Sequence, residues 1–171
     1  MQKEPEILKI ELATVDVDLG CLTALLHRAY AELGDMGLRF KAVDQSIDVT
    51  RQRIDAGECF LASIGSSLVG TALFIPPHRT KGTAWLNRPD VASLHQLAVE
   101  PNYQRSGVGR RLMEVVEARA AKCGAVELAL DTAEPATHLQ RWYASRGYRT
   151  IEMAQWAHTN YRSVIMSKGL L

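Results

Sequence analysis

The chain has 171 residues, 47% of them hydrophobic and 23% charged, which is ordinary for one folded domain and too apolar for a disordered chain. Its 20 Lys and Arg residues and its 19 Asp and Glu residues leave a net charge of +1, and this balance argues against a protein dedicated to nucleic acids or membrane surfaces. No apolar run approaches the roughly 18 residues of a membrane span, and the first ten residues lack the pattern of a secretory signal, so we expect a single cytoplasmic domain over residues 1–171.

The chain begins with a predicted strand and a predicted helix. Apolar and polar residues alternate over residues 6–14, which indicates a strand. Leucines and alanines then recur at helical spacing over residues 16–33. Asp16 or Asp18 stands where a side chain caps the first turn, so we expect this helix to begin there.

A loop, a second helix and a β-hairpin follow. Two glycines punctuate residues 34–44, which predicts a loop, and a weaker helical pattern over residues 45–56 ends at a glycine. Residues 58–64 and 67–75 are rich in β-forming side chains and are separated by a Gly-Ser pair. These two strands are therefore expected to form a hairpin.

Residues 76–90 form a predicted loop that is long for a compact domain, and such loops usually carry function or are disordered. A strand over residues 92–99 comes next. After Gly107 and Gly109, apolar residues at helical spacing predict a helix that ends at Gly124.

The last predicted elements are a strand over residues 126–131, a helix over 135–146, and two strands over 148–153 and 161–168. Taken together, the order of strands and helices along the chain predicts a mixed sheet with helices on both faces.

The turn before the third helix carries the first chemical signal. It has the sequence Gln-Arg-Ser-Gly-Val-Gly over residues 104–109. Such a turn aims several main-chain N–H groups at one point, the helix start adds about half a positive charge, and Arg105, Arg110 and Arg111 add more, so the pattern suits a pyrophosphate. It lacks the Gly-Lys-Ser/Thr of a Walker loop and the GxGxxG of a dinucleotide site, and two glycines alone also suit a plain strand-to-helix turn.

Two longer motifs place this turn in context. The segment LHQLAVEPNYQRSGVGRRLM, residues 94–113, and the segment WYASRGY, residues 142–148, stand in the same order as two signatures of a known family. The chain thereby resembles the GCN5-related N-acetyltransferases, the GNAT superfamily, over nearly its whole length. The resemblance implies an α/β (α+β) fold with a mixed, mostly antiparallel sheet of about seven strands and about four helices.

The resemblance also implies acetyl-CoA as the cofactor, with its pantetheine arm along the strand and its pyrophosphate on the amides of the turn. The residues that it assigns to the cofactor are Leu97, Ala98, Val99, Gln104, Arg105, Ser106, Gly107, Val108, Gly109 and Arg110. Two positions depart from the family pattern, because Arg105 stands where a glycine is common and Ala136 where an asparagine is frequent. Side-chain contacts to the cofactor therefore stay open.

Transfer of acetyl to an amine needs a base, because an alkyl ammonium with a pKa of about 10.4 is mostly protonated at pH 7. His95 is the candidate, since a histidine with a pKa of about 6.5 is mostly neutral there; a structural histidine is the alternative. In a regular strand His95 and Leu97 face the same side. Ser93 lies two residues earlier on that face, where it is a candidate for ordering a relay water.

The resemblance gives two further roles. Tyr143 matches the tyrosine that protonates the leaving sulfur, and the N–H of Leu97 matches the donor to the oxyanion. A tyrosine that packs its helix against the sheet is the alternative for Tyr143.

The acceptor is expected to be the primary amine of a small molecule, held by the loops at 34–44 and 76–90 and by the segment 156–161. Alternatives are a peptide or protein N-terminus or lysine, and a non-catalytic acyl-CoA sensor. Cations in the 76–90 loop either favour an acceptor with a carboxylate or phosphate or form a solvated face. Neither the histidines nor the three cysteines show metal-ligand spacing, so no metal is expected. Analogy with the family leaves a homodimer open.

Overall fold

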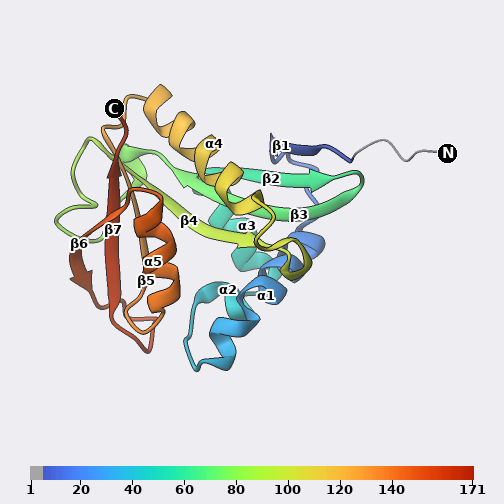
Figure 1. The fold of residues 1–171 in the computed structure, drawn as a ribbon, viewed down its shortest axis with the longest axis horizontal. Coiled ribbons are helices and arrows are strands. Elements are labelled where there is room, and N and C mark those ends of the chain that lie inside the picture. The colour runs from blue at the N-terminus through green and yellow to red at the C-terminus, as the bar shows by residue number, and fades with distance from the viewer. Residues whose placement is uncertain (1–5) are drawn as a thin grey trace.

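The computed structural model describes residues 6–171. Residues 1–5, the first half of the stretch considered for a secretory signal, lie outside the described residues. Its strands form one seven-stranded sheet in the order β1-β2-β3-β4-β5-β7-β6 (Figure 1). Neighbouring strands pair antiparallel except β4 and β5, which are parallel. The strands are β1 (Leu8–Leu12), β2 (Glu58–Ile64), β3 (Ser67–Ile75), β4 (Val91–Val99), β5 (Glu127–Ala133), β6 (Arg149–Ala154) and β7 (Ser163–Gly169).

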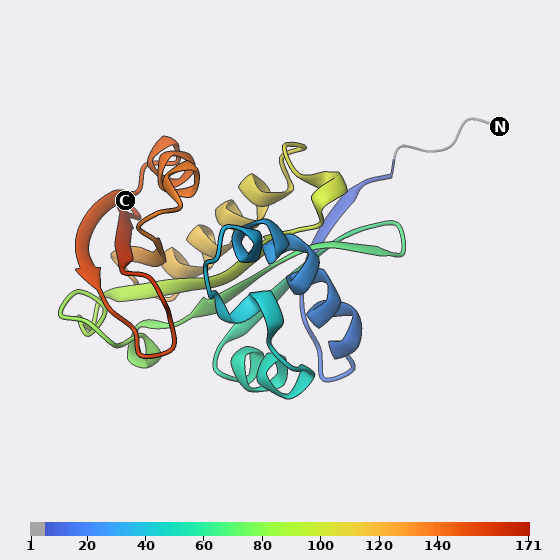
Figure 2. The same ribbon diagram turned by 90° about the horizontal axis from the view of Figure 1, so that it is seen from below.

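Helices cover both faces of this sheet, as Figure 2 shows. They are α1 (Leu19–Asp35), α2 (Lys41–Asp44), α3 (Ile47–Asp55), α4 (Val108–Lys122) and α5 (Thr137–Ser145), with 3₁₀ turns at Pro77–Arg79 and Pro101–Tyr103. Within residues 6–171, none of these helices has the length and apolarity needed to cross a membrane. The mixed sheet with helices on both faces confirms the predicted fold class.

The β2–β3 hairpin has the predicted bounds, and Gly65 adopts the left-handed conformation (φ 58°) that its tight turn requires. The start of α1 is also settled. Asp18 is the capping residue, because its Oδ1 accepts a hydrogen bond of 2.9 Å from the main-chain N–H of Cys21.

The predicted loop over residues 34–44 is partly wrong, because it contains the short helix α2. Phe40 precedes this helix and provides no side-chain cap, so local sequence signals for the helix are weak. Tertiary packing stabilises it instead. Ala42 is buried, and the ring of Phe40 lies 5.6 Å from that of Tyr30 and 5.0 Å from that of Tyr161.

Two hydrophobic cores hold the layers together. On one face, α4 packs Leu112 and Val116 against the sheet, where they join Phe74 of β3. On the other face, α1 packs Leu22 and Leu25 against β2, β3 and β4. A smaller cluster on the β5–β7 half of that second face is covered by the 76–90 loop rather than by a helix. The helices and this loop therefore cover different parts of the second face.

Candidate active site

The sheet splits between β4 and β5. These strands pair only where Val91–Ser93 meets Glu127–Ala129, although both strands continue beyond that point. The register between β3 and β4 shifts a few residues beyond the last β4–β5 pair. Leu73 lies opposite His95, but Thr71 lies opposite Ala98, so β4 has one more residue than β3 over this stretch. The extra residue makes a bulge at Gln96, which takes a left-handed conformation (φ 39°) that is uncommon outside glycine.

The bulge overturns the expectation that His95 and Leu97 face the same side. Ser93 and His95 lie opposite Ile75 and Leu73, which belong to the core under α1 and α3. Leu97 instead packs against the core under α4, on the other face. The regular alternation fails because a bulge inserts one residue into the pleat.

Two cavities lie on either side of this split. The histidine cavity, of about 660 Å³, contains Ser93 and His95. The glycine-turn cavity, of about 640 Å³, runs along the end of β4 to the turn before α4. The residues that line both cavities, and so mark where they meet, are Tyr30, Phe40, Leu97, Asp131 and Tyr143.

The glycine-turn cavity ends at a turn with unusual backbone conformations and unpaired N–H groups. Arg105 (φ 61°) and Gly107 (φ 92°) both adopt left-handed conformations, and Gly107 directly precedes the first residue of α4. The main-chain N–H groups of residues 105–110 find no acceptor among the residues 6–171. Unpaired N–H groups at the positive end of a helix dipole favour a negatively charged group such as a pyrophosphate.

Most of the predicted cofactor residues line this cavity. They are Leu97, Ala98, Val99, Gln104, Arg105, Gly107, Gly109 and Arg110. Two do not. Val108 is buried in the core under α4, and the hydroxyl of Ser106 donates to the main-chain oxygen of Tyr103. The side chain of Val108 is therefore closed to a ligand, and the hydroxyl hydrogen of Ser106 is already used within the turn.

Gly109 marks how closely the turn approaches its neighbours. A Cβ at this position would lie 3.5 Å from Cγ2 of Val99 and 3.6 Å from the ring of Trp142, both of which line the cavity. The side chain of Gln104 also lies here, and its Nε2 donates a hydrogen bond of 3.3 Å to the main-chain oxygen of Val99.

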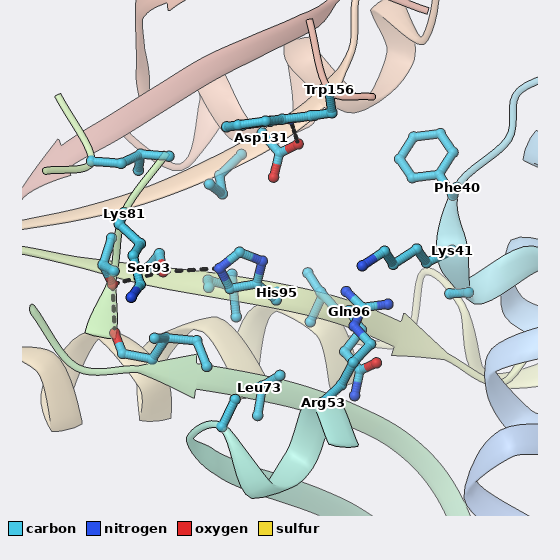
Figure 3. A pocket seen from close by; sticks show the side chains of 18 of the residues that line it. Phe40, Lys41, Arg53, Leu73, Lys81, Ser93, His95, Gln96, Asp131 and Trp156 are labelled. Carbon is cyan, nitrogen blue, oxygen red and sulfur yellow. Dashed lines mark hydrogen bonds between the residues drawn. The ribbon is translucent and has the colours of Figure 1, made fainter. Parts of the chain in front are cut away.

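In the histidine cavity, a chain of hydrogen bonds leads from His95 through Ser93 and Thr80 to the main chain (Figure 3). His95 Nε2 lies 2.9 Å from Ser93 Oγ, which lies 2.9 Å from Thr80 Oγ1. Thr80 Oγ1 lies 3.1 Å from two main-chain oxygens, which accept only, so its single hydrogen points to them. With that hydrogen placed on a main-chain oxygen, Ser93 donates to Thr80 and accepts from His95.

It follows that neutral His95 carries its hydrogen on Nε2 and its lone pair on Nδ1. Nδ1 makes no hydrogen bond to any of residues 6–171 and faces the open cavity in Figure 3. Burial lowers the pKa of His95, the nearby cations Arg53 and Lys41 lower it further, and Asp131 acts in the opposite direction. The ring is therefore a neutral base at physiological pH.

Tyr143 comes from α5 and lines both cavities. Its ring packs edge-on against Trp142, with ring centroids 5.2 Å apart, and this contact holds it at the split. Burial raises the pKa of Tyr143, so the phenol keeps its proton. Tyr30 lies beside it and donates a hydrogen bond of 2.9 Å to the main-chain oxygen of Leu97; burial raises the pKa of Tyr30 to about 12.

Three residues of the histidine cavity were missed by the sequence analysis. Asp131 of β5 lies where the two cavities meet, and its Oδ2 accepts a hydrogen bond of 3.0 Å from Trp156 Nε1. Lys41 and Arg53 line the histidine cavity as well. The signal for Asp131 was an acid in the interior of the mostly apolar strand sequence ELALDTA, whereas the two cations stand on short helices with no comparable signal.

All three segments expected to surround the acceptor line the histidine cavity. Phe40, His78, Lys81, Trp156 and Tyr161 are among their contributions. The 34–44 loop and the 156–161 segment are also joined directly, because Asn160 Nδ2 donates to Gly37 O at 2.8 Å.

The 76–90 loop divides in two. His78, Arg79 and Lys81 line the cavity. Arg88 does not: it pairs with Asp90 at 2.7 Å, and its Cζ lies 4.2 Å from the centre of the Trp85 ring. The expectation of a cationic surface toward the acceptor therefore fits the first part of the loop only.

Comparisons with known proteins agree with this architecture. A model of the acetyltransferase (GNAT) family matches residues 23–148. The uncharacterized N-acetyltransferase YvbK of Bacillus subtilis (strain 168) is 26% identical over 106 residues, and the match spans 62% of this chain and 62% of that relative.

Two solved structures show the same fold. The ribosomal-protein-S18-alanine N-acetyltransferase from Escherichia coli has a TM-score of 0.71 at 20% identity, covering 96% of this chain and 94% of that one. A GNAT family acetyltransferase from Elizabethkingia anophelis, solved with acetyl-CoA bound, has a TM-score of 0.68 at 17% identity, covering 95% of this chain and 97% of that one.

Proposed function

Because the chain belongs to the acetyltransferase (GNAT) family, we propose that it is an N-acetyltransferase that uses acetyl-CoA to acetylate the primary amine of a small molecule. One observation carries the proposal: the glycine-turn cavity and the histidine cavity meet at Tyr143 and Leu97, where β4 and β5 part. A donor bound in one cavity and an acceptor bound in the other would have their reacting ends at this junction.

The residues of the glycine-turn cavity fit coenzyme A. The free N–H groups of residues 105–110 suit its pyrophosphate, and the edge of β4 that β5 leaves unpaired runs toward them along Leu97–Val99. Arg110 already forms an ion pair with Glu114 at 3.2 Å, whereas Arg105 makes no such pair among residues 6–171. When bound, acetyl-CoA supplies an acetyl thioester, and the N–H of Leu97 is the proposed donor to its carbonyl oxygen.

His95 is the proposed base. The amine arrives mostly protonated, and His95 Nδ1 takes the proton that must leave before nitrogen can attack. Ser93 acts on the ring rather than on the substrate, because it accepts the hydrogen on Nε2 and thereby keeps the Nδ1 lone pair toward the cavity. We therefore assign Ser93 as a positioning residue in place of a water relay.

Tyr143 is the proposed acid. As the C–N bond forms and the C–S bond breaks, the leaving sulfur needs a proton, and the Tyr143 phenol remains protonated to supply it. The ammonium nitrogen loses two of its three protons and keeps one in the amide. The sulfur gains one proton, and one proton passes to solvent in each turnover.

Two measurements test the proposal. Calorimetry with acetyl-CoA tests the glycine-turn cavity, and release of free thiol with a panel of primary amines, together with mass spectrometry of the acetylated product, tests the reaction. We expect binding, and thiol release that depends on the amine. Binding without amine-dependent thiol release would favour the acyl-CoA sensor, and absence of binding at millimolar acetyl-CoA would contradict both readings.

A further inference from the structure

The charge of the histidine cavity is at odds with a plain amine as the acceptor. Its lining contains four permanent cations, and Asp131 is the one acid among the described residues that line it. The cations are Lys41, Arg53, Arg79 and Lys81. A protonated amine without an anionic group would be repelled by this surface, so the charge favours an acceptor that carries a negative group as well.

Arg53 is the most informative of these cations. It lies in α3, and its Nη1 donates a hydrogen bond of 2.8 Å to Gln45 Oε1. Its Nε and Nη2 find no acceptor among residues 6–171, and it forms no ion pair there. By contrast, six arginines pair with a carboxylate, namely Arg28, Arg88, Arg110, Arg119, Arg149 and Arg162.

A partly buried guanidinium without a carboxylate is costly to the fold, because burial removes water that the charge would otherwise bind. The same burial lowers the pKa of Arg53. A guanidinium with unused donors and no carboxylate partner suits the binding of an anion from outside the chain.

The side chain of Arg53 is held by a buried network. Gln45, which is 5% exposed, donates from Nε2 to Thr50 Oγ1 at 2.8 Å, and Thr23 donates to the same oxygen at 2.7 Å. This network ties Arg53 to α1 and fixes its direction, so little side-chain freedom is lost when an anion binds.

Lys41 and Gln96 lie beside Arg53. Figure 3 shows the charged ends of Lys41 and Arg53 directed into the same part of the cavity. Lys41 makes no ion pair with any of residues 6–171. The buried Nε2 of Gln96 also has no acceptor there, so donors exceed acceptors on this side of the cavity.

Asp131 occupies the opposite side, beneath Trp156 (Figure 3). Its Oδ2 accepts from Trp156 Nε1, whereas Oδ1 accepts no hydrogen bond from residues 6–171. His95 Nδ1 faces the space between the two sides. An ammonium suits the Asp131 side, and an anion suits the Arg53 side.

We propose that the acceptor is a small zwitterion, a primary amine that also carries a carboxylate or a phosphate, with the anionic group bound by Arg53 and Lys41 and the amine held between Asp131 and His95. This inference rests on the proposed N-acetyltransferase function and names the substrate class of that site. It disfavours polyamines and plain alkylamines as acceptors.

Matched pairs of probes test the inference: 4-aminobutyrate against propylamine, L-leucine against 3-methylbutylamine, and O-phosphoethanolamine against ethanolamine. The first two pairs test a carboxylate and the third a phosphate. In at least one pair, we expect the anionic member to bind the protein alone at least tenfold more tightly by calorimetry, and to give at least tenfold higher kcat/KM in thiol release.

In each pair for which the wild type prefers the anionic member, the variant Arg53→Gln should bring the ratio of the two affinities, and of the two kcat/KM values, toward one. The anionic member should lose about tenfold to hundredfold in affinity. Arg51→Gln is the matched control, because Arg51 is in the same helix but does not line the cavity, and it should keep the wild-type ratio. The inference is overturned if the wild type binds both members of every pair equally, or if Arg53→Gln keeps the preference. A binding preference without thiol release from any amine would instead overturn the proposed reaction and leave the anion site standing.

Discussion

Replacing Ser93 with alanine tests the hydrogen-bond chain that sets the proton on His95. Ser93 is 2% exposed, and its Oγ is 2.9 Å from His95 Nε2. Without this oxygen, the Nε2 hydrogen has no acceptor, and a buried donor without a partner costs about 1–3 kcal/mol. The ring escapes that cost by moving its hydrogen to Nδ1, which removes the lone pair from the cavity.

The size of the effect follows from that cost. A change of 1.4 kcal/mol is a tenfold change in an equilibrium, so Ser93→Ala should lower kcat/KM by about 5-fold to 150-fold at pH 7. Thiol release measures this loss. NMR of the imidazole nitrogens measures the tautomer directly, and His95 should change from a hydrogen on Nε2 to a hydrogen on Nδ1.

The matched control is Ser163→Ala in β7. Ser163 is also fully buried, but its hydroxyl has no partner among the described residues. Removing that hydroxyl should leave kcat/KM within about twofold and leave the free energy of unfolding unchanged or higher by about 1 kcal/mol. If Ser93→Ala matches the control in kcat/KM and keeps the Nε2 hydrogen, the assigned proton order is wrong.

Three further variants test the site. His95→Gln should lower kcat/KM by about 10²–10⁴-fold. Because burial lowers the pKa of His95 and the neutral ring is the active form, the kcat/KM of the wild type should fall only as pH drops below about 6.5. The variant should lack this acidic limb of the pH–rate profile. Tyr143→Phe should lower kcat by about tenfold or more while the Kd for acetyl-CoA stays within about threefold, and an unchanged kcat would remove the proposed acid. Gly109→Ala should raise the free energy of unfolding by up to about 1 kcal/mol, since its Cβ would be in ordinary contact with Val99 and Trp142. The same variant should weaken acetyl-CoA binding in calorimetry. Equal affinity would show that the turn does not approach the ligand.

The elements predicted best are those whose signals are local. Residues 58–64 and 67–75 are rich in β-forming side chains, and Gly65 supplies the turn, so the hairpin is determined within eighteen residues of sequence. The turn at 104–109 is similar, since its glycines precede apolar residues at helical spacing, and α4 begins at Val108 directly after Gly107.

The predictions that failed depend on contacts distant in sequence. The bulge at Gln96 has no glycine to mark it, and it appears only in the pairing of β4 with β3. The histidine cavity brings together Lys41 from α2, Arg53 from α3 and Asp131 from β5, and no spacing rule joins residues so far apart. Its charge could therefore be seen only once the fold was known.

The bulge explains why one short segment of β4 serves two cavities. In an ordinary strand, residues two apart face the same side, so His95 and Leu97 would point into one space. The extra residue at Gln96 turns Leu97 to the α4 face while His95 stays on the α1–α3 face. The same irregularity lies just beyond the last pair of β4 and β5, and Gln96 lines the histidine cavity together with Tyr143 and Asp131. A left-handed conformation at a residue other than glycine costs about 1–2 kcal/mol, and this strain accompanies the turn of Leu97 away from the face that carries His95.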